Sequence, residues 1–190
     1  PAYIVLTGNP NSGKTTLFNA LTGLRAKVGN YAGVTVERKE GRLLAAPATS
    51  NARVLDLPGT YSLSPQSMDE QISRDVLLNR LPELPAPSVI VVVVDASNLQ
   101  RNLYYASQVI ELGHPTLIAL NMIDVAEENG HHIDVGKLAG EQARDNPFVV
   151  GRRHASGKTL EQREHPAAHE IGLEPEERLL RMGRGGQCLE

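Results

Sequence analysis

The feature that most constrains the fold is a glycine-rich loop near the start of the chain, Gly8-Asn9-Pro10-Asn11-Ser12-Gly13-Lys14-Thr15. It matches the pattern G-x-x-x-x-G-K-[ST], in which glycines let successive backbone N–H groups point at phosphate oxygens. An apolar run, residues 3–6, precedes the loop, and a segment with helical spacing, residues 16–21, follows it. Because the motif needs a strand before it and a helix after it, this context predicts a phosphate-binding loop rather than an ordinary turn.

The residue types in this loop predict its chemistry. Lys14 is expected to reach the β- and γ-phosphates of a nucleoside triphosphate, and the Thr15 hydroxyl to be a ligand of Mg²⁺. The field at the amino end of the following helix adds to the attraction for phosphate. The residues that we expect to contact the nucleotide here are Gly8, Asn9, Pro10, Asn11, Ser12, Gly13, Lys14, Thr15 and Thr16.

Composition limits the class of protein. The chain has 190 residues, 41% hydrophobic and 22% charged, enough for one domain with a sizeable core, or one domain and an appendage. A net charge of −3 gives no electrostatic reason to expect nucleic acid or an anionic membrane as the main partner. The single cysteine, Cys188, excludes an internal disulfide framework. The longest apolar run, residues 89–94, is far shorter than the ~20 residues of a membrane span, so a soluble chain is expected.

Hydrophobic patterning predicts alternating strands and helices. Strands are expected at residues 3–6, 35–44, 52–57, 88–94, 115–120 and 148–150. Helices are expected at residues 16–21, 68–81, 99–112 and, more weakly, 134–143. This alternation predicts an α/β fold with a mostly parallel sheet and helices on both faces.

Local signals refine three of these segments. The unbroken β-branched run at residues 88–94 is typical of a central strand covered on both sides. Ser67 is expected to cap the helix at residues 68–81, with Glu70 completing a capping box. The glycine-rich residues 29–33 are expected to form a flexible polar segment.

Candidate site residues all follow strands, and ligands of parallel sheets bind at the carboxyl ends of strands. Asp56-Leu57-Pro58-Gly59 has the form D-x-x-G, in which Asp56 would hold Mg²⁺ through a water molecule and the Gly59 amide would sense the γ-phosphate. On its own D-x-x-G is a weak signal that many strand exits produce. It gains weight because it follows a phosphate loop.

A second motif, Asn121-Met122-Ile123-Asp124, resembles the guanine-reading N-K-x-D. The Asp124 carboxylate would accept hydrogen bonds from N1–H and the exocyclic amine of guanine, which adenine does not offer in that arrangement. Asn121 would brace the loop. Thr35 follows the glycine-rich segment, where a switch threonine would close over Mg²⁺ and the γ-phosphate.

Taken together, these motifs and the segments around them resemble the cytosolic GTPase domain of the FeoB family of prokaryotic ferrous iron transporters. The resemblance covers about residues 3–145 and is carried by residues 8–15, 28–37, 56–63, 73–75, 94–103 and 121–124. It implies a P-loop NTPase fold of the Ras-like type that binds and hydrolyses GTP with Mg²⁺. It also implies a switch for iron uptake at the cytoplasmic face of the cell membrane. The partner would be the transmembrane iron-permeation part of the same full-length protein, with oligomerisation left open.

The resemblance also assigns catalytic roles. Asn11 matches the loop asparagine that helps to hold K⁺ beside the phosphates in potassium-stimulated GTPases, and the carbonyls of Gly29 and Tyr31 complete that site in the family. Lys14, Asn11, Thr35 and Gly59 are therefore the expected catalytic set. Thr60 stands where Ras-like proteins place glutamine and is too short to orient water in the same way. Slow intrinsic hydrolysis is expected.

The resemblance fails towards the end of the chain. We expect a GTP-binding domain at residues 1–150 and a divergent or poorly ordered tail at residues 151–190, without the family's helical domain. Ala155 and Ser156 are the nearest, and poor, candidates for the loop that packs on guanine. Three interpretations of the tail stay open: a divergent last strand and helix, a disordered segment, or a stretch foreign to the domain.

Two alternative functions remain beside the transporter switch. One is a guanine-nucleotide sensor with no meaningful turnover, which a threonine at position 60 favours. The other is a ribosome-assembly GTPase, which would need a basic RNA-binding appendage that the net charge of −3 argues against.

Overall fold

The core of the protein is a sheet whose strands follow the hydrophobic pattern of the sequence. The structure, a computed structural model, describes residues 2–44, 46, 51–134, 137–138, 150–152 and 162–163. The strands are β1 (Tyr3–Gly8), β2 (Ala26–Asn30), β3 (Glu37–Arg42), β4 (Arg53–Asp56), β5 (Val89–Asp95), β6 (Thr116–Asn121), β7 (Val150–Arg152) and β8 (Gln162–Arg163). The helices are α1 (Lys14–Thr22), α2 (Met68–Leu77), the 3₁₀ turn η1 (Ala96–Asn98), α3 (Leu99–Ile110) and α4 (Ile123–Glu128).

The sheet is parallel in its centre and antiparallel at its edges. The strand order is β2-β3-β4-β1-β5-β6-β7-β8. Strands β4, β1, β5, β6 and β7 run parallel, whereas β2–β3, β3–β4 and β7–β8 pair antiparallel. The parallel strands therefore end at the same edge of the sheet, which is where ligands of such sheets bind.

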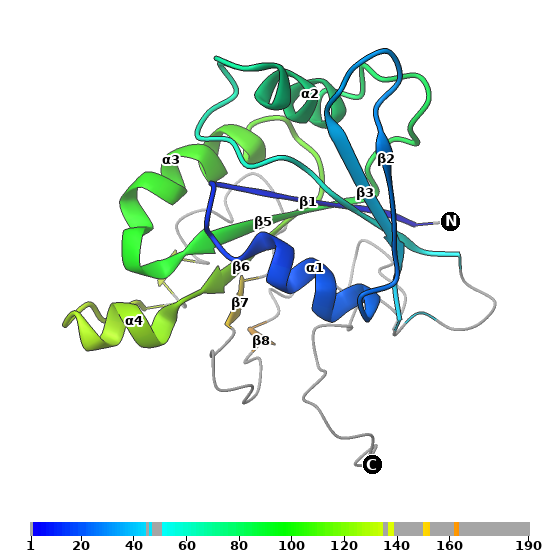
Figure 1. Cartoon of the computed structure of the whole chain (residues 1–190). Coiled ribbons are helices and arrows are strands. Elements are labelled where there is room, and N and C mark those ends of the chain that lie inside the picture. Colours follow the sequence, from blue (N-terminus) through cyan, green and yellow to red (C-terminus); the bar gives the residue numbers. More distant parts are fainter. Residues whose placement is uncertain are drawn as a thin grey trace.

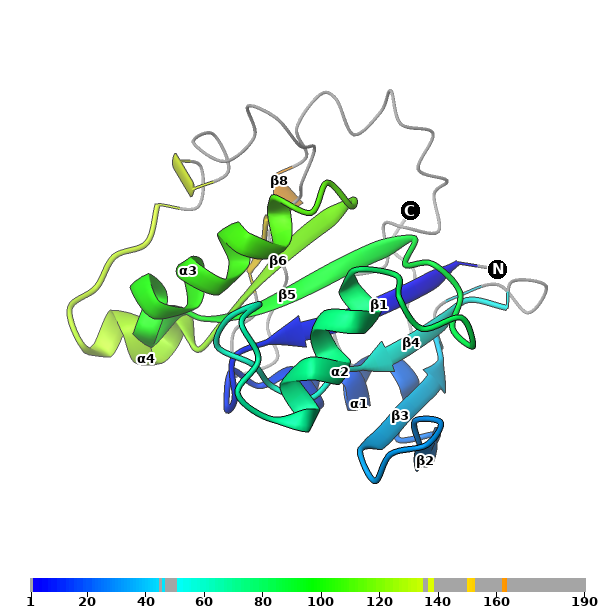
Figure 2. The same ribbon diagram turned by 90° about the horizontal axis from the view of Figure 1, so that it is seen from above.

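Helices cover both faces of this sheet (Figures 1 and 2). On one face Leu17 and Phe18 of α1 pack with Val91 and Val93 of β5. On the other face the side chains of α2, α3 and α4 pack with Ile90, Val92 and Val94 of the same strand. Successive side chains of a strand point to opposite faces, so a strand buried on both sides must be apolar throughout. The expectation that residues 88–94 form a central covered strand is confirmed.

The predicted fold class, an α/β fold with a mostly parallel sheet, is confirmed, but some elements were not predicted, among them β2 and α4. Strand β2 includes Gly29 and Asn30, so the expectation of a flexible segment beginning at residue 29 is wrong there. The side chains of β2 are all exposed, so its sequence shows no alternation of hydrophobic and polar residues that would predict a strand. Backbone pairing with β3 holds the strand in place. The short helix α4 begins directly after Met122. Met122 has a left-handed backbone conformation, which a methionine in the sequence does not predict.

The capping of α2 agrees with the prediction in one half only. The Ser67 hydroxyl accepts a hydrogen bond from the Glu70 amide at 3.2 Å, as expected. In a capping box the Glu70 carboxylate would return to the Ser67 amide, but it accepts from the Gln66 amide instead, at 2.7 Å. The helix ends at Leu77 rather than at residue 81.

Several predictions lie outside the described residues. They include most of the helix expected at residues 134–143, the strand start at residues 148–149, and the guanine-packing candidates Ala155 and Ser156. The proposed division at residue 150 stays a prediction, because only four residues beyond it are described, at positions 151–152 and 162–163. Within the described ranges, no helix has the length and apolar character required to cross a membrane.

Candidate functional site

The glycine-rich loop joins β1 to α1 and has the backbone conformation that its residue types allow. Gly13 and Asn11 have positive φ angles of 88° and 64°. A Cβ atom on Gly8 would lie 2.4 Å from the carbonyl oxygen of Val93, so only glycine fits beside β5. The loop ends at Gly13, which is the N-cap of α1, so the free N–H groups of the first helical turn adjoin it. Such a curled backbone at a helix amino terminus is an anion-binding geometry.

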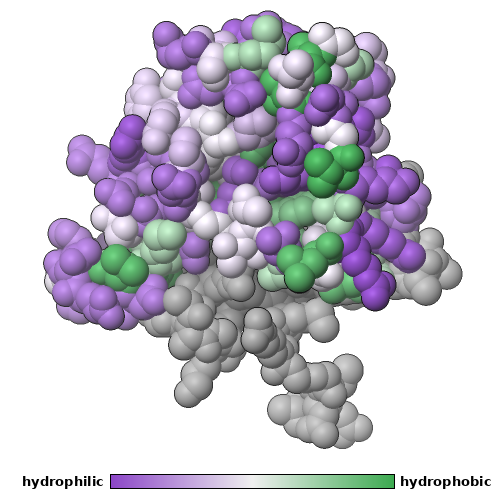
Figure 3. All heavy atoms as spheres, in the orientation of Figure 1, coloured by the Kyte–Doolittle hydropathy of each residue, from purple (hydrophilic) through white to green (hydrophobic). Residues whose placement is uncertain are grey.

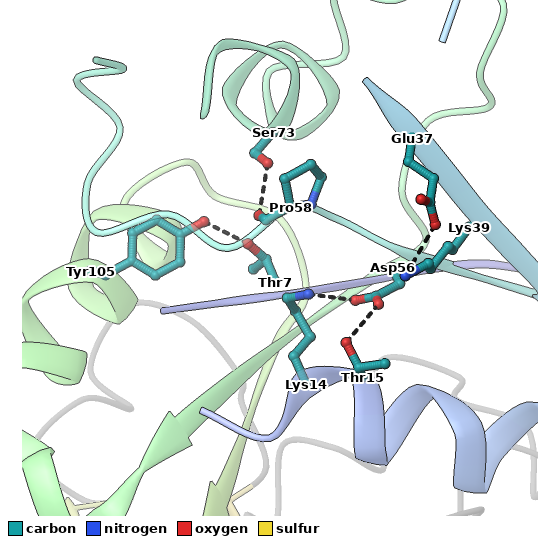
Figure 4. A network of polar contacts seen from close by, with 9 residues as sticks. All are labelled: Thr7, Lys14, Thr15, Glu37, Lys39, Asp56, Pro58, Ser73 and Tyr105. Carbon is teal, nitrogen blue, oxygen red and sulfur yellow. Dashed lines mark hydrogen bonds and ion pairs between the residues drawn. The ribbon is translucent and has the colours of Figure 1, made fainter. Parts of the chain in front are cut away.

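The loop lysine meets the carboxylate of the D-x-x-G motif (Figure 4). Lys14 Nζ lies 2.7 Å from Asp56 Oδ1, and both residues are buried. The Thr15 hydroxyl donates to Asp56 Oδ2 at 3.3 Å. Three residues that the sequence placed in one phosphate and Mg²⁺ site are thus brought together. The hydroxyl and carboxylate oxygens are the hard donors that Mg²⁺ prefers, so this donor set fits the ion.

The turn after Asp56 is docked on the phosphate loop. The Thr60 amide donates to the Gly8 carbonyl at 3.1 Å. A Cβ atom on Gly59 would lie 2.9 Å from the backbone of Pro10, so glycine permits this approach. The buried Ser73 hydroxyl of α2 donates to the Pro58 carbonyl at 2.9 Å (Figure 4). The position of the turn is therefore defined from two sides.

The side chain at the position of the Ras-like glutamine is already engaged. Thr60 is buried, and its hydroxyl donates to the Ser62 carbonyl at 2.9 Å and lies 3.3 Å from Glu70 Oε1. The Leu63 amide donates to Gln108 of α3 at 2.8 Å, and the Arg101 guanidinium stacks 4.0 Å from the centre of the Tyr61 ring. The loop after Gly59 is thus held against α3 while Thr60 is occupied locally.

The candidate purine-reading loop contacts the phosphate loop directly. The Asn121 amide Nδ2 donates to the Ser12 carbonyl at 2.9 Å, so Asn121 braces the loop as expected. Asp124 lies in the first turn of α4, and its buried Oδ1 has no hydrogen-bond partner among the described residues. Buried polar atoms are nearly always paired, so this unpaired carboxylate oxygen is suited to accept a hydrogen bond from an N–H group of a bound ligand.

Other expected ligands are not assembled around the lysine. Thr35 is exposed, and among the described residues it forms no hydrogen bond to Lys14, Thr15 or Asp56. The Tyr31 carbonyl, an expected K⁺ ligand, accepts the Val34 amide at 3.3 Å. Gly29 lies in β2, and Asn11 is exposed in the phosphate loop. Their expected roles at Mg²⁺ and K⁺ stay predictions.

A contact between β1 and α3 that positions the site was among those that the sequence did not predict. Thr7, the residue before Gly8, shares a 2.6 Å hydrogen bond with the Tyr105 hydroxyl of α3, and both side chains are fully buried (Figure 4). Burial raises the pKa of Tyr105, which keeps the phenol neutral and able to pair with the threonine. The only signal in the sequence was a tyrosine on the apolar face of a helix, which ordinarily indicates packing.

We expect Tyr105→Phe to lower the free energy of unfolding by about 1–3 kcal/mol, because the change leaves the buried Thr7 hydroxyl unpaired. Urea titration measures this effect. Tyr104→Phe is the matched control, since Tyr104 is 61% exposed one position earlier on the same helix. Equal stability of both variants would contradict the assigned hydrogen bond.

Comparison with known proteins agrees with this geometry. The family model for ferrous iron transport protein B, the FeoB amino-terminal family, matches residues 2–161 of the chain. The chain belongs to the FeoB family. The FeoB resemblance predicted from the motifs is therefore confirmed, and the chain is an amino-terminal G domain of that family.

Curated FeoB relatives are much longer than this chain. The Fe(2+) transporter FeoB of Salmonella typhimurium is 54% identical over 140 residues, which are 72% of this chain and 17% of the relative. The FeoB of Escherichia coli K12 is 51% identical over the same shares. The chain thus spans about a sixth of the length of the relatives that it matches.

Solved FeoB structures share the fold. A mutant of the S. thermophilus NFeoB bound to GDP is 46% identical, with a TM-score of 0.69 over 80% of this chain and 56% of that chain. The G domain of the T. maritima FeoB is 36% identical, with a TM-score of 0.66 over 80% of this chain and 87% of that chain. The expected P-loop NTPase fold is confirmed by these neighbours.

Proposed function

We propose that this FeoB G domain binds GTP, hydrolyses it slowly, and acts as the nucleotide-dependent switch of a ferrous iron transporter. The observation that carries the proposal is the meeting of Lys14, Thr15 and Asp56 at the mouth of the glycine loop. The GDP bound to the S. thermophilus relative supports a guanine nucleotide as the ligand. The transporter role rests on the names of the longer relatives.

In this proposal, nucleotide binding replaces the Asp56 carboxylate by phosphate as the partner of Lys14. The Lys14 ammonium, paired with Asp56 at 2.7 Å, leaves the carboxylate for the β- and γ-phosphates. Thr15 and Asp56 are then free to hold Mg²⁺, which supplies neutralisation of phosphate charge. The N–H groups at the start of α1 complete the cradle around the phosphates.

Hydrolysis requires a water in line with the γ-phosphate and groups that stabilise the developing charge. Lys14 and the Gly59 amide provide positive charge and a hydrogen-bond donor. Thr35 joins them when residues 28–37 close over the nucleotide. Asn11, with the carbonyls of Gly29 and Tyr31, would hold K⁺ beside the phosphates, where the ion would neutralise developing charge. GTP thus draws residues 28–37 and 57–70 towards the γ-phosphate, and hydrolysis releases them.

One observation favours the alternative of a sensor without meaningful turnover. The Thr60 hydroxyl donates its only proton to the Ser62 carbonyl, so it cannot also donate a hydrogen bond to an attacking water. Steady-state phosphate release with and without potassium separates the two functions. A potassium-stimulated rate supports the GTPase switch. A rate that potassium does not change, and that equals the uncatalysed rate, supports the sensor.

The guanine assignment predicts a large effect at Asp124. We expect Asp124→Asn to weaken GTP and GDP binding at least about 100-fold, because two hydrogen bonds to a charged acceptor are lost. Fluorescence titration with GTP, GDP and ATP analogues measures it. Asp134→Asn is the matched control, because that exposed carboxylate accepts only the Lys137 amide among the described residues. Equal affinity of the unmodified chain for ATP and GTP would overturn the assignment.

The ion pair of Lys14 with Asp56 predicts that Asp56→Asn changes nucleotide affinity in opposite directions with and without Mg²⁺. Without Mg²⁺, we expect Asp56→Asn to raise GDP affinity several-fold, since Lys14 no longer has to leave a carboxylate. With Mg²⁺, the same change should lower affinity, because an oxygen ligand is lost. Titration in EDTA and in magnesium buffer measures both effects. Asp75→Asn, which removes a partner of Arg74 on α2, is the control and should change neither affinity.

A further inference from the structure

A basic surface lies on β2, β3 and β4, at one edge of the sheet. Side chains on alternate residues of a strand share a face, so Arg38, Glu40 and Arg42 of β3 point to the same side of the sheet. The register places Lys27 opposite Glu40, and Arg42 opposite Arg53. On the opposite side of β3, Gly41 packs against Thr22 of α1. The basic residues therefore lie on the sheet face away from α1.

This face is hollowed into a pocket of about 490 Å³. Its charged lining residues are five cations and one carboxylate: Arg25, Lys27, Arg38, Arg42, Arg53 and Glu40. The chain as a whole carries a net charge of −3, so this concentration of positive charge is local. This local positive charge attracts anions even though the net charge of the chain is negative.

One buried carboxylate arranges the guanidinium groups. Glu40 is buried and pairs with Arg38 through one oxygen and with Arg53 through the other, the latter at 2.7 Å. Burial lowers the pKa of Arg38, but the hydrogen bond and charge of Glu40 outweigh it and raise the pKa overall. A single carboxylate cannot neutralise two guanidinium groups. The pocket is therefore cationic at every physiological pH and its arginines are oriented before any ligand arrives.

Exposed apolar side chains follow some of these cations closely along the chain, at the edge of the sheet. Leu24, Val28 and Leu44 are 77%, 64% and 54% exposed. Val28 lies opposite Lys39, so its side chain is on the other side of the edge strand β2 from Lys27. Figure 3 shows hydrophobic side chains interrupted by hydrophilic ones on the side of the molecule formed by β2 and β3. Exposed apolar groups beside lysine and arginine are the pattern of segments that bind at a membrane interface.

We propose that this face of β2, β3 and β4, the basic face, binds the phosphate headgroups of an anionic phospholipid membrane. Guanidinium groups match phosphate oxygens in pairs. The exposed leucines and valine, which border the basic face at the edge of the sheet, bury apolar area at the acyl boundary. The relatives are iron transporters of which this chain matches only 17%, so in such a protein the domain would lie near a bilayer. The proposal goes beyond nucleotide binding and does not depend on it.

Vesicle flotation of the full 190-residue chain tests this proposal. We expect binding to vesicles of phosphatidylglycerol and phosphatidylcholine, none to phosphatidylcholine alone, and release by high salt. Arg25→Gln combined with Lys27→Gln should lower the partition coefficient about 25-fold, from about fivefold per basic residue. Both side chains are exposed, so the fold is kept. Arg80→Gln with Lys137→Gln removes the same charge elsewhere and should have little effect.

Several outcomes would overturn the basic face as a lipid site. These are equal binding to neutral and anionic vesicles, equal loss in both double variants, or no vesicle binding at millimolar lipid. Capture of poly-glutamate without vesicle binding would assign the face to an acidic protein partner instead. Nucleotide titration of the same variants is a separate readout. It should be unchanged, so failure of the lipid proposal leaves the GTPase proposal intact.

Discussion

Lys14→Ala is expected to abolish nucleotide binding and to destabilise the protein. Lys14 supplies the only charged side chain of the phosphate loop, so GTP affinity should fall at least about 100-fold. The change also leaves the buried Asp56 carboxylate without its 2.7 Å ion pair. Removing one partner of a buried pair typically lowers the free energy of unfolding by about 3–5 kcal/mol. Isothermal titration and urea unfolding measure the two effects.

The control for this change is another lysine–carboxylate pair that lies in solvent. Lys39 pairs with Glu37 at 3.1 Å, and both side chains are more than a third exposed. Lys39→Ala should lower the free energy of unfolding by less than about 1 kcal/mol and leave nucleotide affinity unchanged. Combining Lys14→Ala with Asp56→Ala should restore most of the stability but none of the binding. Undiminished nucleotide retention by Lys14→Ala would end the GTPase interpretation.

Gly8→Ala is expected to have the second largest effect. The added Cβ atom would lie 2.4 Å from the Val93 carbonyl oxygen and 3.1 Å from the Ser12 hydroxyl. The carbonyl belongs to the central strand β5 and cannot move aside, so the loop must shift. Overpacking of this kind costs about 1–3 kcal/mol of stability. Displacing binding groups by about 1 Å costs on the order of 100-fold in activity, which nucleotide titration and phosphate release would detect.

Gly113→Ala separates this clash from backbone strain. Gly113 has a φ of 78°, and no atom lies within 4 Å of the position that a Cβ atom would take, so alanine there meets strain and no obstruction. We expect a loss of about 1–2 kcal/mol in stability and no loss of nucleotide affinity. If Gly8→Ala, like Gly113→Ala, left nucleotide affinity unchanged, the close approach of β5 to the loop would not matter for nucleotide binding.

The sequence predicted the parallel core well because burial there leaves a strong pattern. A strand covered on both faces, such as β5, must be apolar throughout, and few other structures require this. It predicted the edges poorly. Strand β2 has only exposed side chains and is defined by pairing with β3, which is a long-range property that no local pattern records. The start of α4 depends on a positive φ at Met122, a residue type that rarely adopts it.

The site could be predicted where each residue type has a fixed chemical task. Lys14, Thr15 and Asp56 were expected together and lie together. The contacts that position them were not foreseen, because Ser73 and Tyr105 belong to helix faces that are typical of packing surfaces. The buried Glu40 was also missed, since a glutamate in an exposed strand gives no sign that it organises two arginines from different strands.

The hydrogen bond from Asn121 to the Ser12 carbonyl joins positions 109 residues apart. It sets the spacing between the region that would receive phosphate and the region that would receive a purine. That spacing is fixed when the chain folds, so the distance between the phosphate site and the purine site is set before a nucleotide binds. Affinity for nucleotide analogues with a shorter or longer link between base and phosphate should therefore decline steeply, because the two regions cannot move apart or together to fit them.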